Sequence, residues 1–201
     1  MITYKGLEYN IVQSPITGRF WLDRNLGANR IAQSINDKEA FGDYYQWGRI
    51  SDGHEKINSL TVDELITDHN ISHNCFVTST KMNNYDWLSV QNDNLWLDMD
   101  NIKEICPPGF RLPTKKEMIE EKFVDENVLN SSDAFNCFLR LPSAGYRYYK
   151  DASISRQGQF GDIWTSSVDE EKAISFHFYK DDSFFYSNYR ANAYSIRCIK
   201  D

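Results

Sequence analysis

Side chains able to take part in recognition or chemistry gather near the C-terminal end of the chain, between residues 162 and 194. Aromatic rings alternate there with carboxylate, imidazole and amide groups. Tyrosine and tryptophan give rigid contact area at low entropic cost, while serine and asparagine give adaptable hydrogen bonds. We therefore predict a binding surface formed by Asp162, Trp164, His177, Tyr179, Asp181, Phe185, Tyr186, Asn188, Tyr189 and Asn192, with Phe184 beside them.

A strand and a turn are expected to position these groups. Ile174, Phe176 and Phe178 alternate with more polar side chains, so these three should face the core. The acidic run Asp181-Asp182-Ser183 predicts a turn. Residues 181–189 are too polar and turn-like to be buried throughout, and some of their rings should therefore be exposed.

Metal-binding patterns are weak in this sequence. One polar segment lacks the glycine and terminal glutamate of an EF-hand loop and is expected to be solvated; it contains Asn92, Asp93, Asn94, Asp98, Asp100 and Asn101. His69 and His73 would share a helix face, with Cys75 nearby, but no fourth ligand accompanies them. We predict neither a metal nor a cofactor.

Catalytic patterns are also missing from the sequence. No Ser-His-Asp or Cys-His arrangement can be assembled from the spacing of these residue types. His54 is expected to make a structural hydrogen bond. Glu120 and Glu121 are expected to be solvated charges on a helix surface. The chain is therefore predicted not to be an enzyme.

The clearest local element is a helix that begins after Pro113. Thr114 offers a side-chain oxygen as the N-cap, and Glu117 three residues later completes a capping box. The buried side of this helix is expected to carry Met118, Ile119 and Phe123.

The remaining elements are shorter. Residues 14–18, Ser-Pro-Ile-Thr-Gly, predict a hairpin turn between two strands. The spacing of three aromatic residues predicts a helix over 37–47, with Gly42 weakening it. A short helix is expected at 62–67 and a short buried strand at 137–142.

Residues 50–105 are rich in Asn, Asp and Ser and show little periodicity. They predict a long loop excursion held by buried Trp87, Leu95 and Trp96. A last strand is expected over 194–199. One helix-rich half and one strand-rich half make an α+β fold, which we expect to span residues 1–201 as a single domain.

Composition excludes several classes of partner. The 201 residues are 41% hydrophobic and 14% aromatic, and the formal net charge is −7. No run of Lys or Arg is longer than two, which argues against nucleic-acid binding and against an anionic-membrane helix. No apolar stretch approaches the length of a membrane span, so no membrane insertion is expected.

The first residues, MITYKGLEYN, lack the apolar run of a secretory signal. We therefore expect synthesis in a host cytoplasm, with assembly into a virion as the route to the outside. A signal peptide removed from the start of the sequence would leave the same pattern, and a bacterial cell-surface or secreted location is the alternative.

Six short sequence motifs occur in order along the chain and carry a family resemblance. They are GRFWLDRNLGA (18–28), GDYYQWGR (42–49) with DGH (52–54), YDW (85–87) with QNDNLW (91–96), GFRLPT (109–114), LPSAGYR (141–147) and SIRCIKD (195–201). In this order they resemble the "Fibrobacter succinogenes major paralogous domain", a bacterial and phage family related to the formylglycine-generating-enzyme branch of C-type-lectin-like folds. The resemblance covers nearly the whole chain and is more specific for fold than for function.

The resemblance implies a C-type-lectin-like domain. Two helices should pack on small twisted antiparallel sheets with long ordered loops, and the N- and C-terminal strands should pair. Spacing alone leaves all four cysteines as candidate free thiols. The family carries cysteines where Cys106 and Cys198 stand, which implies that these two could form a disulfide. Cys75 and Cys137 fall outside its pattern and are expected to be unpaired, buried thiols.

Neither calcium-dependent sugar binding nor formylglycine generation, the activities of related families, is expected of this chain. The calcium motifs of sugar-binding C-type lectins, Glu-Pro-Asn or Gln-Pro-Asp followed by Trp-Asn-Asp, are absent from the sequence. Formylglycine-generating enzymes need a pair of active-site cysteines, and the cysteines of this chain are placed differently. The resemblance therefore favours recognition over catalysis.

The resulting hypothesis is a receptor-binding protein at a phage tail tip or tail fibre. Its C-terminal face would bind a host cell-surface protein or glycan, and the chain would dock onto other tail proteins or form a homotrimer. Residues 176–195 are rich in the types that adenine mutagenesis produces from asparagine codons, so this face could be a target of a diversity-generating retroelement. The alternatives are a structural virion or cell-surface decoration that contacts neighbouring subunits, and a secreted bacterial adhesin.

Overall fold

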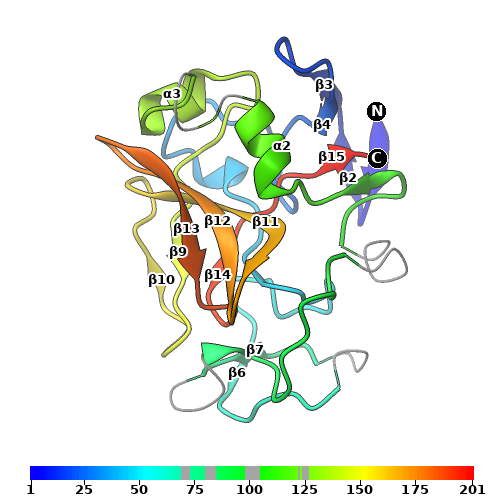
Figure 1. Cartoon of the computed structure of the whole chain (residues 1–201), viewed down its shortest axis with the longest axis vertical. Helices are drawn as coiled ribbons and strands as arrows, with labels where there is room; N and C mark the ends of the chain where they lie inside the picture. Colours follow the sequence, from blue (N-terminus) through cyan, green and yellow to red (C-terminus); the bar gives the residue numbers. More distant parts are fainter. Residues whose placement is uncertain (69–72, 80–84, 98–104, 122, 124–126) are drawn as a thin grey trace.

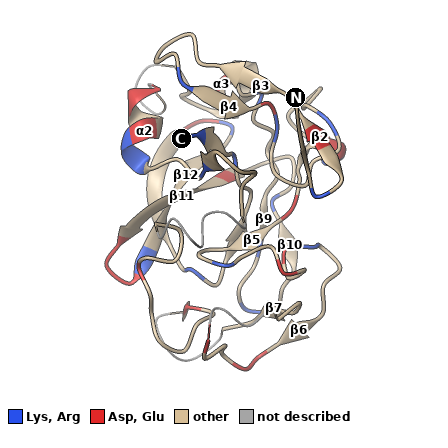
Figure 2. Ribbon diagram, turned by 90° about the vertical axis from the view of Figure 1, so that its right-hand side faces the viewer, with Lys and Arg blue, Asp and Glu red and all other residues tan. Residues whose placement is uncertain are grey.

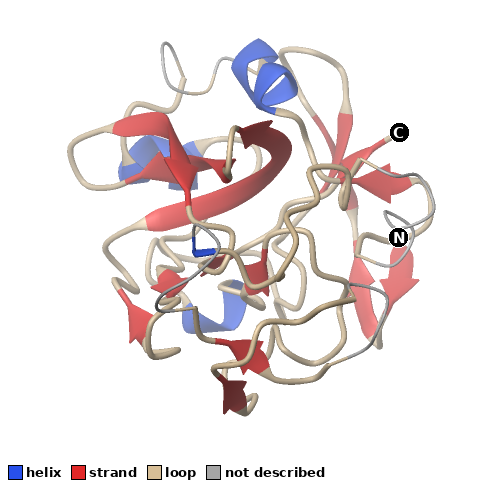
Figure 3. Cartoon of the chain, turned by 60° about the horizontal axis from the view of Figure 1, so that its bottom comes forward, coloured by secondary structure: helices blue, strands red, loops and turns tan. Residues whose placement is uncertain are grey.

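The computed structural model describes residues 1–68, 73–79, 85–97, 105–121, 123 and 127–201. This part of the chain combines small, mostly antiparallel sheets with two short α-helices, α2 (Lys115–Glu120) and α3 (Ser131–Asn136). Both helices lie at one end of the molecule and the strands β6 and β7 at the other (Figure 1), and loops connect most elements (Figure 3). The expected α+β class is confirmed.

The longest strands form a three-stranded antiparallel sheet. Its order is β11 (Gly161–Asp169), β12 (Lys172–Phe178) and β13 (Ser183–Asn188). Ile163, Phe176 and Phe185 are opposite one another across the three strands and face a core that includes Trp21 and Met118. Because side chains alternate along a strand, the other face of the sheet is left for a different use.

A second sheet joins the two ends of the chain. Its order is β3 (Ile11–Gln13), β4 (Phe20–Leu22), β15 (Ile199–Lys200) and β8 (Phe110–Arg111). Both chain ends lie on the same side of the molecule, and the predicted hairpin turn at 14–18 connects β3 to β4 (Figure 1). A disulfide between Cys106 and Cys198, the pair that the resemblance implied, ties the strand that ends the chain to the segment before β8.

A third sheet lies beside the first. It runs β10 (Ile154–Ser155), β9 (Tyr146–Arg147), β14 (Ala193–Tyr194) and β5 (Tyr45–Gln46). The backbone N–H of Trp164 in β11 donates to the Ser195 carbonyl at 3.1 Å, and this bond links the third sheet to the first. Two further pairs are small: β1 (Ile2–Tyr4) with β2 (Leu7–Tyr9), and β6 (Thr61–Val62) with β7 (Phe76–Val77).

The polar excursion between residues 50 and 105 is held by its aromatic residues, as predicted. Trp87, Leu95 and Trp96 are all buried. The indole N–H of Trp87 donates to the Trp47 carbonyl at 2.6 Å, and that of Trp96 donates to the Arg49 carbonyl at 3.3 Å. A segment with little hydrophobic periodicity is thereby fixed by a few large side chains.

Three of the element predictions are wrong. Residues 37–47 contain only a 3-10 helix, η1 (Lys38–Ala40), before β5. Gly42 has φ +74°, and a Cβ there would lie 2.3 Å from the Leu26 carbonyl oxygen, so the chain turns where a helix would continue. Residues 62–67 are not helical, because the backbone of Val62 pairs with β7 and that of Ile66 bridges to Leu88. Residues 137–142 follow α3 as a turn rather than a strand.

The last predicted strand, 194–199, is divided between β14 and β15. Side chains on both of its faces are buried, including Ser195 and Arg197. The Arg197 guanidinium donates to the Asn25 side chain at 2.9 Å and to the Leu139 carbonyl at 2.6 Å. Period-two alternation fails here because these polar groups find hydrogen-bond partners inside the protein.

The predicted helix α2 is confirmed with its capping box, since the Thr114 side chain accepts from the Glu117 N–H and Glu117 accepts from the Thr114 N–H. Met118 and Phe123 are buried as expected, but Ile119 is 46% exposed. The prediction for Glu121 is also wrong, because its side chain is fully buried. Its carboxylate accepts from the hydroxyls of Ser14 and Thr17 and, at 3.3 Å, from the Trp21 indole.

Substitution of Glu121 tests this buried contact. Glu121→Ala leaves three donors without an acceptor, and we expect it to cost roughly 2–4 kcal/mol of unfolding free energy in urea denaturation. The matched control is Glu120→Ala, whose half-exposed carboxylate pairs with Arg19 at 2.6 Å and should contribute less than about 1 kcal/mol. Equal losses in the two variants would contradict the buried role of Glu121.

Asp86 provides a second stability test, through pH. Burial raises its pKa to about 6, although its carboxylate accepts the Leu88 N–H at 3.2 Å. The unfolded chain ionises near pH 4, so stability falls as the pH rises from about 4 to 6 and stays lower above that. Asp86→Asn should therefore be more stable than the wild type at pH 7, by up to about 3 kcal/mol, and about equal at pH 4. Asp63→Asn, at an exposed site, should show no such pH-dependent gain.

Candidate functional site

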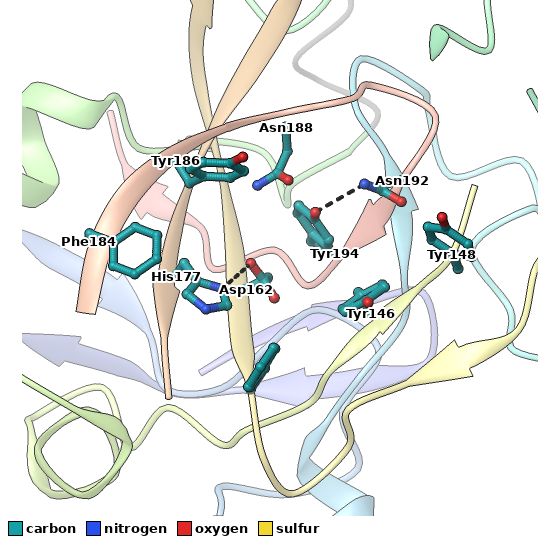
Figure 4. Close-up of a pocket in the computed structure, with 10 residues that line it drawn as sticks. Tyr146, Tyr148, Asp162, His177, Phe184, Tyr186, Asn188, Asn192 and Tyr194 are labelled. Atoms are coloured by element: carbon teal, nitrogen blue, oxygen red, sulfur yellow. Dashed lines mark hydrogen bonds and ion pairs between the residues drawn. The ribbon is translucent and has the colours of Figure 1, made fainter. Parts of the chain in front are cut away.

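An open cavity of about 240 Å³ lies on the face of the β11–β12–β13 sheet that is turned away from the core. Figure 4 shows its lining side chains converging from several elements. They are Tyr146, Tyr148, Phe160, Asp162, His177, Phe184, Tyr186, Asn188, Asn192 and Tyr194. We call this cavity the aromatic pocket.

Strand alternation supplies one wall of the aromatic pocket. Phe184, Tyr186 and Asn188 are two residues apart on β13 and share a face. The register pairs His177 of β12 with Phe184 on one side and with Asp162 of β11 on the other. The same register turns the intervening Phe185 into the core, where its ring contacts Phe176 with centroids 5.6 Å apart.

The third sheet supplies the other wall, with Tyr146 of β9 and Tyr194 of β14. Their rings meet edge to face, with centroids 6.1 Å apart. The ring of Tyr194 also lies against the indole of Trp164, with centroids 4.4 Å apart. The indole N–H of Trp164 donates to the Tyr45 carbonyl at 2.7 Å. Trp164 thus holds the two sheets together beneath the pocket.

A buried carboxylate lies at the base of the aromatic pocket. Asp162 is only 3% exposed, and its Oδ1 is 2.8 Å from Nδ1 of His177. Within the described residues no donor reaches its second oxygen, which points away from His177 (Figure 4). Burial raises the pKa of Asp162, and the hydrogen bond from His177 partly offsets this.

Tyr194 and the two amides complete the polar lining. Burial and the nearby Asp162 charge hold the pKa of the Tyr194 hydroxyl well above its usual range, so the hydroxyl stays protonated. It accepts from the Asn192 side-chain amide at 3.2 Å. The Asn188 amide donates to the Ser175 hydroxyl at 2.9 Å, which leaves the Asn188 carbonyl oxygen for a ligand.

The structure brings half of the predicted binding residues into one pocket. Asp162, His177, Tyr186, Asn188 and Asn192 line it, as does Phe184. Tyr186 is 56% exposed, which agrees with the expectation of exposed rings in this segment. The segment is nevertheless a regular strand over most of its length, because β13 pairs with β12 from Ala173 to Phe178.

The other predicted binding residues lie elsewhere. Trp164 is fully buried and Phe185 faces the core, so neither can meet a ligand without rearrangement. The Tyr189 ring packs on Tyr85 and Tyr149. Asp181 lies at the exposed turn between β12 and β13, and Tyr179 lies beside the pocket rather than in it, with its ring 5.8 Å from that of Phe160.

Sequence reasoning missed four residues of the aromatic pocket: Tyr146, Tyr148, Phe160 and Tyr194. Tyr146 and Tyr148 lie some thirty residues before His177 in the chain. Only the pairing of β9 with β14 brings them beside the other pocket residues. Their dense aromatic run, Tyr146-Arg147-Tyr148-Tyr149, was the one signal in the sequence that could have indicated them.

A second polar cluster is buried away from the pocket. The ligand atoms of Asp52, His54 and Glu55 lie within 4.8 Å of one another, an arrangement that could suggest a metal. Both nitrogens of His54 are already engaged, since Nε2 accepts the Gln46 N–H and Nδ1 bonds to Asp52 at 2.6 Å. Arg49 pairs with Asp52 at 2.7 Å. Burial and Arg49 lower the pKa of His54 to about 4, so it is neutral and structural, as predicted.

The other residues considered as metal ligands are not brought together by the described structure. His69, Asp98, Asp100 and Asn101 lie outside the described residues. The Asp93 carboxylate pairs with Arg190 at 2.6 Å. Cys75 and Cys137 are unpaired, as expected, although both are only partly buried.

Figure 2 shows basic and acidic residues interspersed along the ribbon, for example within α2. None of the helices in the described residues is long and apolar enough to cross a membrane. The pocket itself is distinguished by its aromatic rings and the buried carboxylate of Asp162.

Comparison of the chain with protein-family models, with curated proteins and with solved structures gave no match. The site must therefore be interpreted from its own geometry.

Replacing the buried carboxylate tests the energetics of the site. Because burial raises the pKa of Asp162, ionisation costs folding free energy as the pH rises above about 4. Asp162→Asn removes that cost, so we expect its melting temperature to exceed that of the wild type at pH 7, with a smaller difference near pH 4. A variant less stable than the wild type at both pH values would show that Asp162 serves stability instead.

Proposed function

We propose that this chain is a non-catalytic recognition domain of the C-type-lectin-like fold, and that it binds its ligand in the aromatic pocket. The observation that carries the proposal is the pocket itself, an open cavity of about 240 Å³ lined by six aromatic rings, two amides and a carboxylate–imidazole pair. Apolar walls with a few placed polar groups are the usual make-up of a small-ligand site.

The composition of the pocket favours binding over bond-breaking chemistry. Asp162 and His177 touch each other, but no hydroxyl or thiol nucleophile is hydrogen-bonded to the imidazole in the described residues. A serine or cysteine nucleophile that uses an imidazole as its base needs such a contact. The most exposed lining residue, Tyr186, is instead the type that contributes most to recognition surfaces.

The family resemblance supplies the biological setting of the proposal. In that setting the domain is the receptor-binding part of a phage tail tip or tail fibre, and the ligand belongs to a host cell-surface protein or glycan. Residues 176–195, which include β13 and its exposed Tyr186, would be the part that a retroelement diversifies. Docking to other tail proteins or homotrimer formation belongs to the same proposal.

A small-molecule panel tests whether the pocket binds ligands. Monosaccharides, nucleosides, amino acids and alkylamines would be screened by ligand-observed NMR and by shifts in melting temperature. We expect at least one class to bind the wild type, and Tyr186→Ala to weaken it about tenfold or more, the equivalent of about 1.4 kcal/mol. The matched control is Phe20→Ala, which removes a 40%-exposed ring from β4, outside the pocket.

Two results would overturn this proposal. One is that no class binds; the other is that Phe20→Ala weakens binding as much as Tyr186→Ala. If Tyr186→Ala instead disrupts assembly of the protein with itself or with other virion proteins, the face is an assembly surface and the structural-decoration alternative is supported.

A further inference from the structure

We propose that the aromatic pocket is selective for an alkylammonium group, with Asp162 as its counter-charge. The inference rests on the proposed function, because it names the ligand chemistry of the same pocket. It follows from the charge at the base of the pocket, the rings around it and the hydrogen-bonding capacity that remains there.

The first argument is an uncompensated charge. Asp162 is almost fully buried, and its partner in the described residues is His177 alone. The second oxygen of this carboxylate has no donor among the described residues, and the carboxylate lines the pocket, where a ligand can reach it. An isolated buried carboxylate is costly unless a cation meets it. The basic residue nearest in sequence to the pocket tyrosines, Arg147, is engaged elsewhere, with the Lys56 carbonyl at 2.9 Å and the Ser59 hydroxyl at 2.6 Å.

The second argument is the arrangement of rings around that carboxylate. Figure 4 shows Tyr146 and Tyr148 on one side of Asp162 and Phe184 on the other, with Tyr186 and Tyr194 between them. The face of an aromatic ring attracts cations through its quadrupole, and rings gathered around a cation form the cage used to recognise ammonium groups. A neutral ligand would gain apolar contact from these rings but nothing from the carboxylate.

The third argument separates ammonium from guanidinium. A guanidinium binds a carboxylate best through two parallel hydrogen bonds to both oxygens. In Asp162 one oxygen already accepts from His177, so that fork has no complete partner. A compact ammonium needs only the remaining oxygen, and the carbonyl oxygen of Asn188 offers a second acceptor in the same pocket.

The same ammonium chemistry could come from a lysine side chain, an amino sugar or a free amine. Three pairs of probes, each differing in charge but little in shape, distinguish these sources. They are Nα-acetyl-lysine amide against Nα-acetyl-norleucine amide, glucosamine against glucose, and n-butylamine against 1-butanol. Binding would be measured by ligand-observed NMR and calorimetry at pH 7.

For at least one pair we expect the charged member to bind about tenfold or more tightly than the neutral one. Asp162→Asn should abolish that preference. Asp63→Asn, which removes the same charge from an exposed site far along the chain, should leave it unchanged. Tyr186→Leu should weaken the charged probe by a few-fold and the neutral one less, since it removes a ring but keeps apolar contact. This variant tests the contact between the ring and the cation independently of the charge at Asp162.

The outcomes separate this inference from the proposed function. If neutral sugars or nucleosides bind and depend on Tyr186 while no ammonium probe is preferred, the selectivity is wrong and the binding function stands. If ammonium probes bind with the same preference in Asp162→Asn, the assigned counter-charge is wrong. If no probe of either kind binds in the pocket, both proposals fail together.

Discussion

The contact between Trp164 and the backbone of Tyr45 is the one on which the site depends. The indole N–H of Trp164 donates to the Tyr45 carbonyl at 2.7 Å, and the indole face lies against Tyr194. Trp164 belongs to the β11–β12–β13 sheet, whereas Tyr45 and Tyr194 belong to the sheet that carries Tyr146. This side chain, together with the backbone bond from Trp164 to Ser195, links the two sheets whose side chains line the aromatic pocket.

The β11–β12–β13 sheet is used on both of its faces, and this division explains the composition of its strands. Ile163, Phe176 and Phe185 pack on the core, while Asp162, His177 and the exposed ring of Tyr186 face the pocket. Neighbouring side chains along a strand point to opposite faces of the sheet. Phe185 of β13 therefore packs on the core, while Phe184, Tyr186 and Asn188 of the same strand line the pocket.

Buried polar groups that bond to other protein groups are the second recurring feature. Glu121 is satisfied by two hydroxyls and an indole, Arg197 by backbone carbonyls and an amide, and His54 by Asp52 and a backbone N–H. Asp162 differs from these, since one of its oxygens has no protein donor in the described residues. Because this carboxylate lines the aromatic pocket, a ligand can reach the oxygen that His177 leaves free.

The sequence by itself determined the elements whose signals are local. The capping box at Thr114 and Glu117, the turn at 14–18 and the core face of β12 depend on neighbours in the chain, and each was predicted correctly. Half of the predicted binding residues also line the aromatic pocket, most of them on strands of clear composition. Only the tertiary structure decided that Trp164 and Phe185 are buried, that Glu121 is internal, and that Tyr146 faces Asp162. Those outcomes depend on which distant strands pair, and pairing is set by the packing of the whole chain rather than by the residues on either side.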